Sequence, residues 1–210
     1  FGSTRIKAVL LDEKHAIVKS GDYTWKSSLE NGVWTYHMED VQEGLRTAIR
    51  NLGKLPGKIS AMGVSGMMHG YLAFDKDWNL LAPFRTWQNT MTGEAADKLT
   101  EAFGFNIPQR WSAAHLYQAV LNGEPHVKNI AHITTLSAYV HWQLTGQRVL
   151  GVGDASGMFP IDSETLTYDA VMLDKFDVLM AKYGFDWNIR AVLPEVRTAG
   201  QSAGLLTASG

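Results

Sequence analysis

The chain has 210 residues, 45% of them hydrophobic and 19% charged, a balance typical of a folded globular protein. Its 19 basic and 21 acidic residues give a net charge of −2 without a block of like charge, which removes the electrostatic basis for binding nucleic acid or an anionic membrane. The absence of cysteine excludes disulfides, thiolate zinc sites and cysteine nucleophiles, and no apolar run approaches the ~18 residues of a membrane span. These features are compatible with a cytoplasmic protein, which we expect here.

The first elements in chain order are strands. An apolar run at residues 6–11, a polar turn and a return strand starting at residue 16 predict a β-hairpin within residues 4–25. A third short strand is expected at residues 33–36. An amphipathic helix follows, and Gly53 suits its end. Its apolar positions at i, i+4, i+7, i+8 and i+11 are Val41, Leu45, Ala48, Ile49 and Leu52.

Strands and then helices are expected in the remainder of the chain. An apolar strand is predicted at residues 59–64, with further strands at 71–75 and 80–87. From residue 93 the apolar spacing becomes helical. The four helical faces lie within residues 95–103, 113–121, 136–144 and 173–183. A short strand is expected at 149–150, and the small residues of 198–210 indicate a loop. This order predicts a mixed α/β domain.

A turn beside the first strand is the first candidate for chemistry. Gly2 allows backbone N–H groups to approach an oxyanion, and the hydroxyl groups of Ser3 and Thr4 add donors, so the turn could bind a phosphate. Lys7 lies on the same strand face as Arg5 and could add a positive charge. The alternative interpretation is a simple turn at the solvated end of a strand.

Two further segments follow predicted strands, where a sheet edge opens to ligands. Met68 and His69 lie between two glycines, and there the methionine could pack on sugar carbons while the histidine binds a hydroxyl. Trp87 and Asn89 combine an indole face with an amide, a pair suited to the C–H and O–H surfaces of a sugar. The alternatives are a structural histidine beside a bulge and a buried tryptophan at a strand end.

The loop at residues 153–157 carries one carboxylate, Asp154, among small residues, which suggests close backbone approach either to a ligand or within the fold, and the packing role is favoured. The seven histidines show no metal-ligand spacing, so we expect no metal site formed by the protein. The sequence contains no P-loop, no dinucleotide-binding glycine motif and no nucleophile elbow.

Taken in order, these segments resemble the N-terminal domain of the FGGY family of carbohydrate kinases. Phe1–Lys7 is similar to the family's first phosphate loop, Asp-x-Gly-(Ser/Thr)-(Ser/Thr)-x-x-(Lys/Arg), without its leading Asp. Met68–Gly70 matches the Met-His-Gly of xylulokinase-like members, and Trp87–Met91 falls at the family's Trp-x-Asp-x-Arg. The other similar segments are Trp111–Ala113, Leu136–Gly146 and Gly153–Met158.

The resemblance implies a ribonuclease H-like domain of the actin, hexokinase and sugar-kinase superfamily, with a mixed sheet and flanking helices. It also implies transfer of the γ-phosphoryl group from ATP with Mg²⁺ to a sugar hydroxyl, with a ketopentose such as xylulose, or a related sugar or polyol, as the substrate. A homodimer is compatible with it. The residues that the resemblance assigns to phosphate are Gly2, Ser3, Thr4 and Lys7, and those it assigns to substrate are Met68, His69, Trp87 and Asn89.

Three departures from the family pattern leave the particular sugar open. Asn89 replaces a common Asp, Met91 an Arg, and Ala138 an Asp. The family's catalytic base lies in a Gly-Asp segment that does not occur after residue 184, so we expect it beyond Gly210. Residues 1–210 are therefore predicted to be a sugar-binding domain cut at both ends, without the ATP-binding domain and inactive alone. The alternatives are a non-catalytic sugar-binding or regulatory module of the same fold and an unrelated α/β domain.

Overall fold

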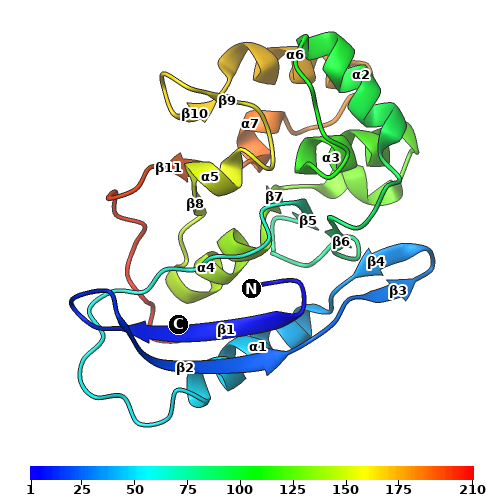
Figure 1. Cartoon of the computed structure of the whole chain (residues 1–210). Coiled ribbons are helices and arrows are strands. Elements are labelled where there is room, and N and C mark those ends of the chain that lie inside the picture. Colours follow the sequence, from blue (N-terminus) through cyan, green and yellow to red (C-terminus); the bar gives the residue numbers. More distant parts are fainter.

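A computed structural model describes residues 1–210 (Figure 1). The helices are α1 (Met38–Arg50), α2 (Gly93–Phe103), α3 (Ser112–Leu121), α4 (Leu136–Thr145), α5 (Val152–Ala155), α6 (Ala170–Ala181), α7 (Ile189–Val192) and the 3-10 helix η1 (Pro125–Asn129). The strands are β1 (Arg5–Leu11), β2 (Ile17–Thr24), β3 (Ser28–Glu30), β4 (Val33–Thr35), β5 (Gly70–Phe74), β6 (Arg85–Thr86), β7 (His132–Thr134), β8 (Val149–Gly151), β9 (Ile161–Asp162), β10 (Thr167–Tyr168) and β11 (Glu195–Arg197).

The N-terminal part is the predicted hairpin covered on one face by the predicted helix. β1 and β2 pair antiparallel from Arg5 opposite Thr24 to Leu10 opposite Lys19. Helix α1 lies against this hairpin, as the blue end of Figure 1 shows, and it buries Val41 and Ala48. Both elements and the short strand β4 confirm the sequence interpretation of this region.

Strand β5 lies at the centre of the molecule, between β6 and β7, in a three-stranded antiparallel sheet. All five of its residues are buried, and their side chains alternate between two hydrophobic cores because a strand has a period of two. Tyr71 and Ala73 belong to the larger core, whereas Leu72 and Phe74 belong to the smaller one beneath the hairpin.

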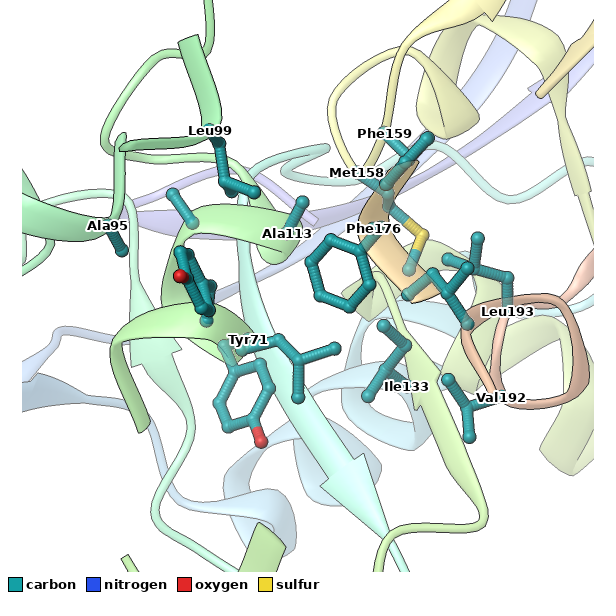
Figure 2. Packing of buried hydrophobic residues seen from close by; sticks show 14 of the residues in the cluster. Tyr71, Ala95, Leu99, Ala113, Ile133, Met158, Phe159, Phe176, Val192 and Leu193 are labelled. Carbon is teal, nitrogen blue, oxygen red and sulfur yellow. The ribbon is translucent and has the colours of Figure 1, made fainter. Parts of the chain in front are cut away.

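The larger core lies under a layer of helices. Figure 2 shows Phe176 of α6 among Met158, Ala113 of α3 and Leu193, with Tyr71 and Ile133 from the sheet below. Helices α2, α3, α4 and α6 confirm the four helical faces predicted from apolar spacing. None of the helices combines the length and hydropathy needed to cross a membrane.

Four expectations differ from the structure. Residues 59–64 form no strand, because β1 pairs only with β2 and no other strand lies in register beside this apolar segment. Within 80–87 only β6 is a strand, since Pro83 lacks an N–H donor. Asp154 lies in the one-turn helix α5 rather than in a loop. The strands are divided among five small sheets rather than one mixed sheet, and only the β8–β11 pair is parallel.

Candidate functional site

The candidate site begins where β5 and β6 meet. Gly70 pairs with Thr86, so the antiparallel register carries His69 and Trp87 to the same end of this ladder. A glycine is required at residue 70, because its φ is +134° and a Cβ there would lie 2.7 Å from the carbonyl oxygen of Arg85. The hydroxyl of Ser112, at the start of α3, donates to the Gly70 oxygen at 2.6 Å and fixes this crossing.

The Met68–His69 segment is packed tightly against the turn that follows α5. A Cβ on Gly157 would lie 2.7 Å from the carbonyl oxygen of Met68 and 2.9 Å from His69 Nδ1. This His69 nitrogen is buried and has no hydrogen bond of standard geometry within the chain. Burial lowers the pKa of His69, and the positive charge of Arg110 lowers it further. The adjacent main chain of Gly157 acts in the opposite direction and raises this pKa. His69 is therefore neutral at pH 7, with one nitrogen able to donate and the other to accept.

Asp154 supports the same turn. Its carboxylate accepts a short hydrogen bond from the hydroxyl of Ser137, at the start of α4. Burial raises the pKa of Asp154, and the Ser137 hydrogen bond partly opposes that rise. A Cβ on Gly66 would lie 3.2 Å from the Ser137 Cβ, so the Gly66–Gly70 segment passes directly beside this pair. The carboxylate thus holds the fold together, as the sequence predicted.

Trp87 and Asn89 have different environments although they are two residues apart. The Trp87 side chain is free to contact a ligand, since the residue is 46% exposed. Asn89 is only 4% exposed, and its amide bonds the main chain of Trp34 and Thr86. The amide that was expected to face a sugar is therefore used inside the fold.

The Gly2–Thr4 turn is held by two aromatic side chains. Trp25 Nε1 donates to the Gly2 oxygen at 2.8 Å, and the Tyr36 hydroxyl donates to the Ser3 oxygen at 2.6 Å. These two rings stack with centroids 4.2 Å apart. The hydroxyl and backbone N–H groups of Ser3 and Thr4 are exposed and make no hydrogen bond within the chain. This donor set fits a phosphate group.

The predicted phosphate turn and the predicted sugar residues lie in one region. The backbone nitrogen of Phe1 donates to the Ser65 oxygen at 2.7 Å, immediately before the Gly66–Gly70 segment. Lys7 is exposed on β1, opposite Asp22, whose carboxylate forms a 3.1 Å ion pair with Arg5. No group of three histidine or carboxylate side chains gathers to hold a metal ion.

A buried polar network lies beneath β5 and β6. Arg85 forms an ion pair with Glu124, and the Tyr71 hydroxyl lies 2.9 Å from His126 Nε2. Burial would raise the pKa of Glu124, but the hydrogen bond and charge of Arg85 outweigh it and leave that pKa below its usual value. Burial, with a smaller contribution from Arg85, lowers the pKa of His115 to about 3.

The sequence interpretation missed several residues that build the site. Ser112 and Ser137 lie in segments similar to the family, but their individual roles gave no local signal, because Ser112 binds Gly70, 42 residues away, and Ser137 binds Asp154, 17 residues away. Trp25 and Tyr36 could have been found as aromatic residues at the ends of predicted strands. One departure from the family pattern is also explained locally: Ala138 is buried in the larger core, where a carboxylate would be desolvated. Nothing in the structure explains Met91, which is 37% exposed.

Comparisons with known proteins agree with this geometry. The sequence profile described as "FGGY family of carbohydrate kinases, N-terminal domain" matches residues 1–210. A glycerol kinase from Thermococcus gammatolerans is 24% identical over 220 residues, which cover 97% of this chain and 43% of that protein. A xylulose kinase from Haemophilus influenzae is 24% identical over 224 residues, which cover 94% of this chain and 45% of that protein.

Solved structures share the fold. A crystal structure of a xyloylose kinase from Brucella ovis superposes with a TM-score of 0.83 at 23% identity, covering 99% of this chain and 43% of that one. The chain thus spans less than half the length of each of these three proteins.

Proposed function

Because this chain belongs to the FGGY family of carbohydrate kinases and matches its N-terminal domain over residues 1–210, we propose that it is the sugar-binding domain of a kinase. The reaction is transfer of the γ-phosphoryl group of ATP to a hydroxyl of a small sugar or polyol. The relatives named glycerol kinase and xylulose kinase support a polyhydroxy substrate. The Met68–His69–Gly70 segment favours a ketopentose such as xylulose.

The observation that carries this proposal is the meeting of two different donor sets. The free hydroxyl and N–H groups of Ser3 and Thr4 suit phosphate oxygens, and the Phe1–Ser65 hydrogen bond joins their turn to the Met68–His69 segment. ATP supplies the phosphoryl group when bound. The turn would orient its phosphate oxygens and stabilise the negative charge of transfer, with Lys7 as a nearby cation.

The sugar would lie between the exposed indole of Trp87 and the Met68–His69 segment. An aromatic face packs against the C–H surface of a sugar, and the neutral imidazole of His69 can exchange hydrogen bonds with a hydroxyl. Water exclusion by the Trp87 and Met68 side chains would strengthen those bonds.

We place the catalytic base outside these 210 residues, in a part of the parent protein that also carries the ATP-binding domain. Asp154 is a poor candidate for the base, because its carboxylate is held by Ser137. The same observation favours a second candidate function, a sugar-binding module that does not transfer phosphate. In both cases residues 1–210 alone are expected to be inactive.

A panel of ketoses, aldoses and polyols, assayed with the full-length parent and Mg·ATP, separates the two functions. We expect phosphorylation of at least one member, a higher KM for that sugar in Trp87→Ala, and a higher KM for ATP in Thr4→Ala. Sugar binding by the parent without turnover of any member would support the non-catalytic module. Robust turnover by the isolated 210-residue chain would show that the base lies within it and refute our assignment.

A further inference from the structure

The side-chain amide of Asn89 forms hydrogen bonds with the main chain of Trp34, in the way that the main chain of a neighbouring strand would. The Trp34 N–H donates to Asn89 Oδ1 at 2.9 Å, and Asn89 Nδ2 donates back to the Trp34 oxygen at 2.8 Å. The second Nδ2 proton is directed to the Thr86 oxygen at 3.0 Å. Both donors of the amide are thus used, and the side chain is buried. It has no donor left for a ligand.

These bonds join two walls of the candidate site. Trp34 lies on the outer edge of the β3–β4 hairpin, and Asn89 lies in the turn after β6 that presents Trp87. Two residues beyond Trp34, the Tyr36 hydroxyl holds the Ser3 oxygen of the phosphate turn. The Asn89 amide therefore links β4, which leads into the Tyr36 that holds the phosphate turn, to the turn that presents the exposed indole.

We propose that Asn89 is a positioning residue of the substrate site, which acts through Trp87 and the β3–β4 hairpin and does not contact the sugar. This inference rests on the proposed function, because it takes Trp87 as a sugar-binding side chain. It assigns to Asn89 a role different from the direct contact that the sequence suggested.

The role requires an amide rather than a carboxylate. An ionised carboxylate at residue 89 could accept the Trp34 N–H, but its second oxygen would face the carbonyl oxygens of Trp34 and Thr86 without a proton between them. Protonation would restore one of the two lost donors. Nearby charges do not change this result: β4 has none, Arg85 of β6 is paired with Glu124, and Glu30 of β3 is paired with His37.

The first experiment measures kinetics in the full-length protein, with xylulose or with the best sugar of the panel above. We expect Asn89→Asp to raise the KM for the sugar about tenfold at pH 8, because the two hydrogen bonds that the amide donates to main-chain oxygens are lost. The ratio to wild type should fall at pH 6, where protonation restores a donor, while the KM for ATP changes less. Asn89→Ala should raise the KM at both pH values. Asn106→Asp, at an exposed position, is the matched control and should leave the KM unchanged.

A carboxylate variant that matches or exceeds wild-type affinity at pH 8 would overturn the proposal, since it would mean that residue 89 contacts the sugar directly or has no role. A second measurement does not depend on activity. Amide hydrogen exchange of a peptide spanning residues 28–37 should be faster in Asn89→Ala than in wild type or in the Asn106→Asp control. Unchanged exchange would refute the pairing itself, whereas a parent that phosphorylates no sugar would refute the proposed function and leave the exchange result standing.

Discussion

Substitution of Gly157 by alanine adds one methyl group, and its effect on stability tests how tightly the candidate site is packed. The substitution Gly157→Ala would place a Cβ 2.7 Å from the Met68 oxygen and 2.9 Å from both His69 Nδ1 and Met68 Cε. The Met68 carbonyl belongs to a main chain that is fixed by Gly70, so the neighbours cannot all move away. Overpacking of this kind costs about 2 kcal/mol. Against it stands the lower entropy of the unfolded chain, which contributes about 0.7 kcal/mol in favour of alanine.

The net expectation is a loss of about 1.3 kcal/mol in the free energy of unfolding, or a Tm lower by roughly 3–5 °C for a domain of this size. Gly153→Ala is the matched control, because nothing lies within 4 Å of its added Cβ. This control variant should keep only the stabilisation from the lower entropy of the unfolded chain, and its Tm should rise by about 1–3 °C. Calorimetry of the two variants and the wild-type chain measures both shifts. Equal shifts of the same sign would show that the turn after α5 does not pack on Met68 and His69 as described.

Two further predictions concern the buried polar network. Since the pKa of His115 falls from 6.5 to about 3 on folding, the unfolded chain binds the extra proton, so stability is complete above pH 6.5 and declines as the pH falls toward 3. His115→Leu should therefore reduce the loss of unfolding free energy between pH 7.5 and 5 by about 2 kcal/mol, measured by urea titration, and an unchanged loss would contradict this reasoning. Glu124→Ala should cost about 3–5 kcal/mol in the same assay, because it leaves the Arg85 guanidinium buried without its partner. Glu94→Ala, which breaks the exposed pair with Lys98, should cost less than about 1 kcal/mol, and similar costs for the two variants would argue against a buried ion pair.

Sequence patterns predicted the elements whose stabilising contacts are local. Helix α1 follows from apolar residues three and four apart, and the β1–β2 hairpin follows from two apolar runs around a polar turn. The apolar run at residues 59–64 has the composition of a strand, but a strand also needs a partner in register, which a local pattern does not specify.

The sequence indicated which segments form the candidate site better than it indicated what each residue does there. Glycines beside Met68–His69 and the hydroxyl groups after Gly2 identified segments that the fold does bring into one region. The role of Asn89 could not be read from the sequence, because its partner Trp34 lies 55 residues away and offers only main-chain atoms. The same holds for Arg85 and Glu124, which are 39 residues apart and meet only after β6 and η1 are in place.

The division of β5 between two cores determines how the molecule opens. Because neighbouring side chains of this strand belong to different cores, neither core can detach from it while the other keeps it in place. The amide protons of β5 should then exchange with solvent only through global unfolding, whereas those of β1 and β2, which pair only with each other, should exchange through partial opening. Gly70 is the first residue of β5, so the part of the candidate site around Gly70 belongs to the last part of the chain to open. The Gly2–Thr4 phosphate turn leads directly into β1 of the β1–β2 hairpin, so it belongs to one of the first parts to open.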